Sequence, residues 1–62
     1  MTTDQLLLAA RNVFVEPNLE EGVNEVTPGV YLFMGVEMMS SPVRQQKYYA
    51  IEEGDNIRIE TA

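Results

Sequence analysis

The sequence predicts an α+β fold in which one N-terminal helix packs on a three-stranded antiparallel β-meander. Three observations favour this fold: a helix start signal near the N-terminus, a long apolar strand in the middle, and two segments of alternating pattern after it. The chain has 62 residues, which predicts a single small domain over 1–62.

The first element is predicted to be a helix over about 3–14. The segment from Thr2 to Gln5 matches a capping box, in which the Thr2 hydroxyl and the Gln5 side chain each bond the other residue's backbone amide. Pro17 disfavours continuation of the helix. The apolar residues at helical spacing are Leu6, Leu7, Ala10, Val13 and Phe14.

An acidic loop is predicted over about 16–28. This segment has a proline near each end, one glycine, two asparagines and four glutamates, which is loop composition. Connections of this length without secondary structure are uncommon and often functional. A solvated connector and a binding loop are both compatible with it.

The most informative segment is the predicted strand over about 29–39, which is apolar on both faces. Successive side chains of a strand point to opposite faces. One face carries Val30, Leu32, Met34, Val36 and Met38, and the other carries Tyr31, Phe33 and Met39. We expect the first face inside the protomer and the second at an interface with another copy or another protein.

Two further strands are predicted over about 44–52 and 56–61, joined by a turn that contains Gly54. A three-residue loop over 53–55 would set Ile51 opposite Ile57, which gathers apolar side chains on one face. A two-residue loop would set Ile51 opposite Arg58. The pattern therefore favours the three-residue loop.

The composition limits both stability and partners. The chain has no Cys and no His, so it has neither a disulfide nor the commonest metal ligands, and oligomerisation is the remaining way to stabilise a domain of this size. The net charge of −6 disfavours direct binding to nucleic acid or to anionic membranes. No leader is recognised and the apolar run 6–10 is too short to span a bilayer, so we expect a cytoplasmic protein.

No group of residues predicts catalysis, a cofactor or a metal site. Without His or Cys, general acid–base and nucleophilic chemistry have few candidates, so an enzyme is not expected. The segment 52–56 is rich in oxygen ligands but lacks the spacing of a calcium loop and is explained by hairpin chemistry.

The interface candidates are the residues on the second face of the strand over 29–39, together with a tyrosine of the next strand, since Tyr and Met often occur at protein contacts. The expected interface residues are Tyr31, Phe33, Met39 and Tyr48. A second set, expected to contact a partner or a small anionic ligand, is Arg44, Lys47 and Tyr48.

These features predict a small acidic interaction protein, a homodimer or larger, that binds a basic surface on another protein. In size, acidity and lack of Cys and His the chain resembles small proteins that bacterial viruses encode to block a host enzyme or defence factor in the host cytoplasm. Two other functions stay open: sequestering a small anionic ligand such as a signalling nucleotide, and serving as a viral structural or assembly component. Carboxylates that could imitate nucleic-acid phosphates are Glu16, Glu20, Glu21, Glu25, Glu52, Glu53, Asp55 and Glu60.

Overall fold

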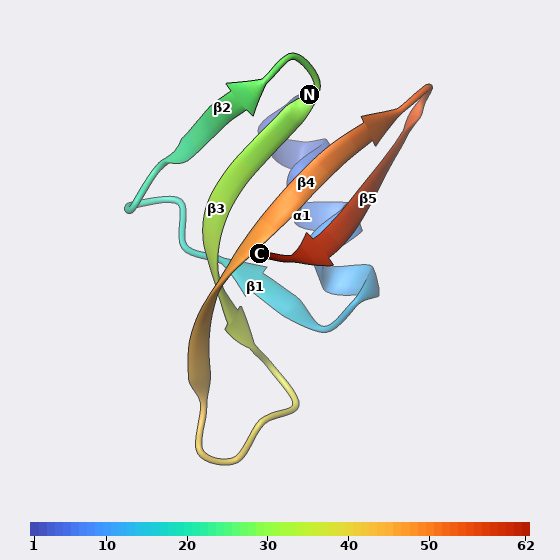
Figure 1. Cartoon of the computed structure of the whole chain (residues 1–62). Coiled ribbons are helices and arrows are strands. Elements are labelled where there is room, and N and C mark those ends of the chain that lie inside the picture. The colour runs from blue at the N-terminus through green and yellow to red at the C-terminus, as the bar shows by residue number, and fades with distance from the viewer.

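The protein consists of one helix followed by five antiparallel strands that form one curled sheet, a half-barrel (Figure 1). The computed structural model describes residues 1–62. The elements are α1 (Thr3–Asn12), β1 (Val15–Pro17), β2 (Val23–Thr27), β3 (Val30–Glu37), β4 (Arg44–Glu53) and β5 (Asn56–Thr61). The strand order is β1-β3-β4-β5, and β2 also pairs with β3.

The α+β class is confirmed, but the prediction of three strands is wrong. The predicted strands 29–39, 44–52 and 56–61 correspond to β3, β4 and β5. The predicted acidic loop over 16–28 contains most of β1 and all of β2. Both pair with the same edge of β3, β1 with Gly35–Glu37 and β2 with Val30–Phe33, so this acidic segment completes the sheet.

The turn between β2 and β3 explains why this segment has loop composition. Thr27 pairs with Val30, so Pro28 and Gly29 form a two-residue hairpin connection. Gly29 has φ +79°, and proline followed by a positive-φ glycine is the signature of a type II turn. Pro28 therefore marks a tight turn inside the sheet and not the end of a long loop.

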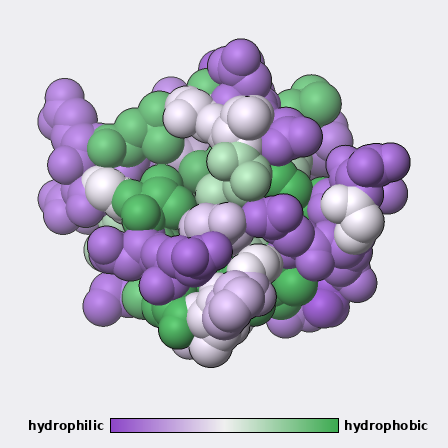
Figure 2. Space-filling model, turned by 90° about the horizontal axis from the view of Figure 1, so that it is seen from above, coloured by the Kyte–Doolittle hydropathy of each residue, from purple (hydrophilic) through white to green (hydrophobic).

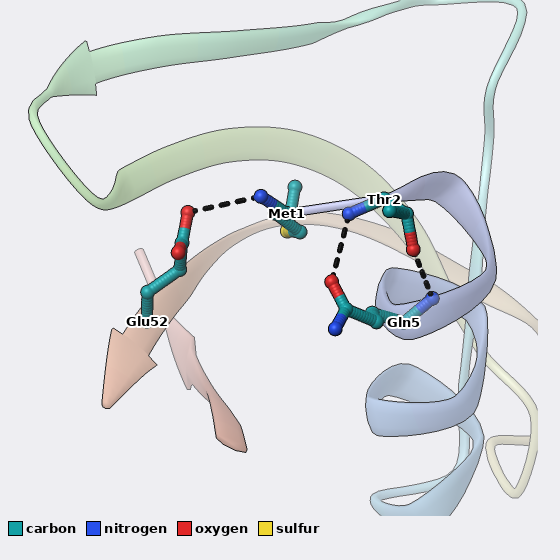
Figure 3. A network of polar contacts seen from close by, with 4 residues as sticks. All are labelled: Met1, Thr2, Gln5 and Glu52. Carbon is teal, nitrogen blue, oxygen red and sulfur yellow. Dashed lines mark hydrogen bonds and ion pairs between the residues drawn. The ribbon is translucent and has the colours of Figure 1, made fainter. Parts of the chain in front are cut away.

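Helix α1 begins with the predicted capping box, which is confirmed (Figure 3). The Gln5 amide donates to the Thr2 hydroxyl oxygen at 3.2 Å, and the Thr2 amide donates to the Gln5 side-chain oxygen at 2.9 Å. The α-amino group of Met1 also lies 3.3 Å from a carboxylate oxygen of Glu52. The helix ends at Asn12, two residues before the predicted end, because Phe14 leaves the helical region with φ +60°.

The two faces of β3 are used in the opposite way to the one expected. Phe33 and Gly35 are buried together with Tyr48 and Ala50 of β4, against Leu6 and Ala10 of α1. The face of Tyr31 and Phe33 is therefore the inner face, and the face of Leu32 and Met34 is the outer one. The expected assignment of faces is wrong because the helix packs on the aromatic face.

The predicted three-residue loop between β4 and β5 is also wrong. Glu53 pairs with Asn56, so the turn has two residues, and Gly54 occupies its first position with φ +63°. Ile51 lies opposite Arg58, while Ile59 lies opposite Ala50. The isoleucines of β5 thus join the inner face, whereas Ile51 points outward.

Gly35 provides space for the core. The rings of Phe33 and Tyr48 stack with their centroids 5.7 Å apart. A Cβ atom on Gly35 would lie 2.6 Å from Cγ1 of Val15 and 2.8 Å from Cδ2 of Tyr48. Only a residue without a side chain lets β1 and the Tyr48 ring approach β3 this closely.

The substitution Gly35→Ala is expected to destabilise the fold by about 1–3 kcal/mol, because it overpacks the core. In a domain this small each kcal/mol corresponds to about 4–8 °C in Tm, which thermal unfolding followed by circular dichroism measures. Adding Val15→Ala removes the closest clash, so the double variant should lose less stability than the sum of the two single variants. Additive losses, or an unchanged Tm for Gly35→Ala, would contradict this description of the core.

Candidate interaction surfaces

The outer face of the sheet carries a strip of apolar side chains that no element of the chain covers. We call it the outer strip; its residues are Val30, Leu32, Met34, Val36, Tyr49 and Ile51. In the β3–β4 ladder Val30 lies opposite Ile51 and Leu32 opposite Tyr49, so the strip is continuous across two strands. Each of its side chains is only partly buried. The only helix packs on the other face.

Charges on the outer face are nearly balanced. Glu21 of the connector after β1 borders this face beside Leu32, Met34 and Lys47. The strand residues on the face include three carboxylates and two cations, a net charge of −1. These residues are Glu16, Glu53, Glu60, Lys47 and Arg58. Arg58 forms ion pairs with Glu53 and Glu60. The outer strip is thus bordered by charges of both signs.

A pocket of about 380 Å³ opens where the end of α1 meets the β3–β4 hairpin. We call it the end pocket. Its walls are mostly apolar, from Val13, Phe14, Val15, Met39, Tyr48 and Ile59, and its polar lining comes from Glu37, Ser40 and Thr61. Val15 and Tyr48 are buried, whereas Phe14 is 57% and Met39 78% exposed. The pocket therefore has a buried floor and an exposed apolar mouth.

Glu37 is the only charged residue in this pocket. The Tyr48 hydroxyl donates to one of its carboxylate oxygens at 3.3 Å, and the Ser40 hydroxyl donates to the other. Burial, and then the neighbouring Glu37 charge, raise the pKa of Tyr48, so this phenol stays protonated and remains a donor at neutral pH. Glu37 forms no ion pair.

The four expected interface residues lie in three different environments. Phe33 and Tyr48 are 2% and 5% exposed and belong to the core, so neither offers a broad surface to a partner, and Tyr48 contributes only to the floor of the end pocket. Tyr31 is half-buried at the edge of the core. Met39 follows the end of β3 and lies at the mouth of the end pocket.

Tyr31 lies between two acidic side chains at the end of the sheet where the β2–β3 and β4–β5 turns lie. A hydrogen bond with Glu52, then one with Glu25, raises the pKa of Tyr31. The same bond with Tyr31, followed by that with the Met1 amine, lowers the pKa of Glu52. These contacts hold Glu52 as a carboxylate, and its stabilising contribution is lost only as the pH falls through its lowered pKa.

The expected ligand-contact residues are not brought together within one chain. Arg44 and Tyr48 lie on the inner face of β4, whereas Lys47 lies on its outer face. Tyr48 is buried in the core and its ring already stacks with that of Phe33, so it cannot stack on a ligand without a change in the core. No pocket of the chain contains Arg44, and the pocket that includes Lys47 also includes Glu21 and four apolar or neutral residues of β2 and β3.

The eight candidate acidic residues are all exposed but lie in separate regions. Glu16, Glu20 and Glu21 lie on β1 and the connector after it. Four others, Glu25, Glu52, Glu53 and Asp55, lie towards the end that carries the two turns. Figure 2 looks onto that end, where hydrophilic groups occupy much of the surface around smaller hydrophobic areas. Glu60 is paired with Arg58 on β5.

No group of three or more His, Cys, Asp or Glu side chains in this chain could hold a metal ion. The single helix is not long and apolar enough to cross a bilayer. No family model, curated protein or solved structure matches the chain.

Sequence reasoning missed two residues of the end pocket. Its helical spacing predicts Phe14 as part of the apolar stripe of the helix, whereas the residue has φ +60° and is 57% exposed. Glu37 could have been identified from the sequence as a candidate site residue, because it is the only charged residue in the apolar segment 29–39. A lone carboxylate in such a strand is costly to bury and requires partners, which here are two hydroxyl groups.

The substitution Phe14→Gly is expected to stabilise the protein by about 0.5–1 kcal/mol, because glycine adopts positive φ without a steric penalty. The exposed ring loses little burial when it is removed. Phe14→Ala is the matched control, since it removes the ring but keeps the unfavourable backbone, and it should give no gain. Chemical denaturation measures both. A loss of more than about 1 kcal/mol in the glycine variant would show that the ring is needed for folding.

Proposed function

We propose that this chain is a non-enzymatic binding protein that acts as a symmetric dimer and presents an acidic surface to a basic protein. The observation that carries the proposal is the outer strip, a continuous apolar surface on the face of the sheet away from the only helix. In the proposed dimer the outer strips of two copies pack face to face. The target is occluded by the acidic surface that remains exposed.

The size of the core supports association. Only 8 of the 62 residues are buried, which leaves a small hydrophobic core for a domain without disulfide or metal. Two sheets that pack face to face lie about 10 Å apart, and the side chains between them interdigitate. The outer strips of two copies can pack in this way. A stable interface of this kind needs roughly 600–800 Å² from each copy, and the whole chain exposes 4313 Å².

Charge permits the same face to meet a second copy. A net charge of −6 on each chain opposes dimerisation when it is concentrated at the contact. The outer face holds only two of these net charges, one from its strand residues and one from Glu21 beside it, and its strand carboxylates and cations alternate around the strip. The repulsion between copies is therefore weak at this face and remains strong at the others.

The remaining charge supports a basic target. Seven of the ten carboxylates form no ion pair, and the three that do are Glu52, Glu53 and Glu60. Their combined field attracts a basic surface and repels nucleic acid. Blocking a nucleic-acid-binding enzyme or a defence factor is the proposed use of this binding, with the carboxylates in place of phosphates.

The protein is expected to sediment as a dimer of about twice its 7.0 kDa chain mass at micromolar concentration. The substitution Leu32→Glu places an unpaired charge in the strip of each copy and should weaken dimerisation at least about a hundredfold. Sedimentation equilibrium measures both.

Leu8→Glu is the matched control, because Leu8 is 66% exposed on α1 and lies away from the outer strip. This variant should remain a dimer. A wild-type protein that stays monomeric at about 100 μM would overturn the proposed dimer, whether or not the Leu32 variant folds.

Binding to a protein captured from the source cells is expected to fall at least tenfold between about 50 and 250 mM NaCl, because salt screens charges on exposed surfaces. The triple variant Glu25→Gln, Glu52→Gln and Asp55→Asn, which neutralises the end with the two turns, should weaken binding further at low salt. Surface plasmon resonance measures both effects. Binding that does not respond to salt would remove the acidic surface from the proposal.

A further inference from the structure

We infer that the end pocket is a binding site for a lysine or arginine side chain flanked by apolar residues in a peptide segment of the partner. This inference rests on the proposed function, since it names the chemistry that the basic partner inserts. The end pocket lies at the junction of α1 and the β3–β4 hairpin, apart from the outer strip, so one copy can use both surfaces at once.

The shape of the pocket suits a side chain. Its volume of about 380 Å³ is at the small end of the range found for ligand sites. The floor is formed by buried residues, Val15 and Tyr48, which are held by the core and by the β1–β3 pairing. The site is therefore largely formed before a ligand enters, which reduces the entropic cost of binding.

The polar chemistry of the pocket selects a cation. Glu37 supplies its only formal charge, a half-buried carboxylate that already accepts bonds from the Tyr48 and Ser40 hydroxyls. A carboxylate has about four acceptor positions, so lone pairs remain for an ammonium or guanidinium group. Its negative charge, in an apolar setting, opposes a phosphate or carboxylate ligand.

No Lys or Arg of the chain itself pairs with the Glu37 carboxylate. Arg44 lies opposite Glu37 in the β3–β4 ladder, but its guanidinium forms no ion pair or hydrogen bond with Glu37. The other residues that line the pocket carry no positive charge. An incoming cation would therefore meet an unpaired carboxylate.

Phe14 supports the proposed site independently of Glu37. Its backbone has φ +60°, a conformation that L-residues with bulky side chains rarely adopt, and its ring is 57% exposed at the mouth of the pocket. An exposed ring on an unfavourable backbone contributes little to folding, which indicates a role outside the core. Aromatic rings attract cations to their faces, and the methylene stem of Lys or Arg can pack on Phe14 and Met39.

A peptide is favoured over a small free amine because of the charge of the whole chain. Glu37 is one of the ten carboxylates of the chain, and the other nine lie outside the pocket. A single free amine would use only Glu37. A basic segment is attracted by the whole field while one of its side chains enters the pocket.

The test is a nuclear magnetic resonance titration of the wild-type protein with acetyl-Leu-Arg-Leu-amide, and with the same peptide in which citrulline replaces Arg. Citrulline keeps the shape and removes the charge. The Arg peptide is expected to shift the resonances of Phe14, Glu37, Ser40 and Tyr48, and the citrulline peptide should bind at least tenfold more weakly.

Glu37→Gln should weaken binding of the Arg peptide at least tenfold. The matched control, Glu20→Gln, loses the same charge outside the pocket and should leave the affinity within about twofold.

Two results would overturn the inference. Equal shifts with both peptides would show that the pocket binds apolar groups without regard to charge. Shifts that appear only near Glu25, Glu52 and Asp55, and not at the pocket, would remove the site while leaving the acidic surface of the proposed function in place. A monomeric wild-type protein that still binds the Arg peptide at Glu37 would instead remove the dimer and keep the pocket.

Discussion

The structure depends on a mismatch between one strand and the cover that the chain provides. Strand β3 is apolar on both faces, but the chain has only one helix, of ten residues, and a helix packs on one face of a sheet. The helix covers the aromatic inner face, where Leu6 and Ala10 meet Phe33 and Tyr48. The outer strip is what remains. An uncovered apolar face follows from the number of elements, whichever face the helix selects.

The choice of the inner face also creates the end pocket. Gly35 lets Val15 and the Tyr48 ring approach β3, and this close approach brings β1 against the sheet directly after the helix. The chain must turn sharply between α1 and β1, and Phe14 makes that turn with a positive φ. The same geometry places the Tyr48 hydroxyl next to Glu37. A core built around a glycine and a tyrosine therefore produces an apolar pocket with one carboxylate.

Local signals in the sequence predicted the helix, its capping box and the positions of β3, β4 and β5. These local signals did not predict the structure correctly where two alternatives fitted the local sequence equally well. Strand β1 has three residues and β2 ends in a Pro-Gly turn, so composition alone indicated a loop. Both faces of β3 are apolar, and only the packing of α1 decides which one is buried. The wrong turn length has the same cause, because the apolar pattern alone favours Ile51 on the face of Ile57 and Ile59, whereas Ile51 pairs with Arg58 on the outer face.

The most direct test of the central claim is whether the outer strip of one copy touches the outer strip of another. A sample that mixes isotope-labelled and unlabelled protein gives nuclear Overhauser effects that arise only between copies. We expect such effects among the methyl groups of Leu32, Met34 and Ile51. Effects confined to other surfaces, or none at all at concentrations near 1 mM, where weak association is populated, would contradict it.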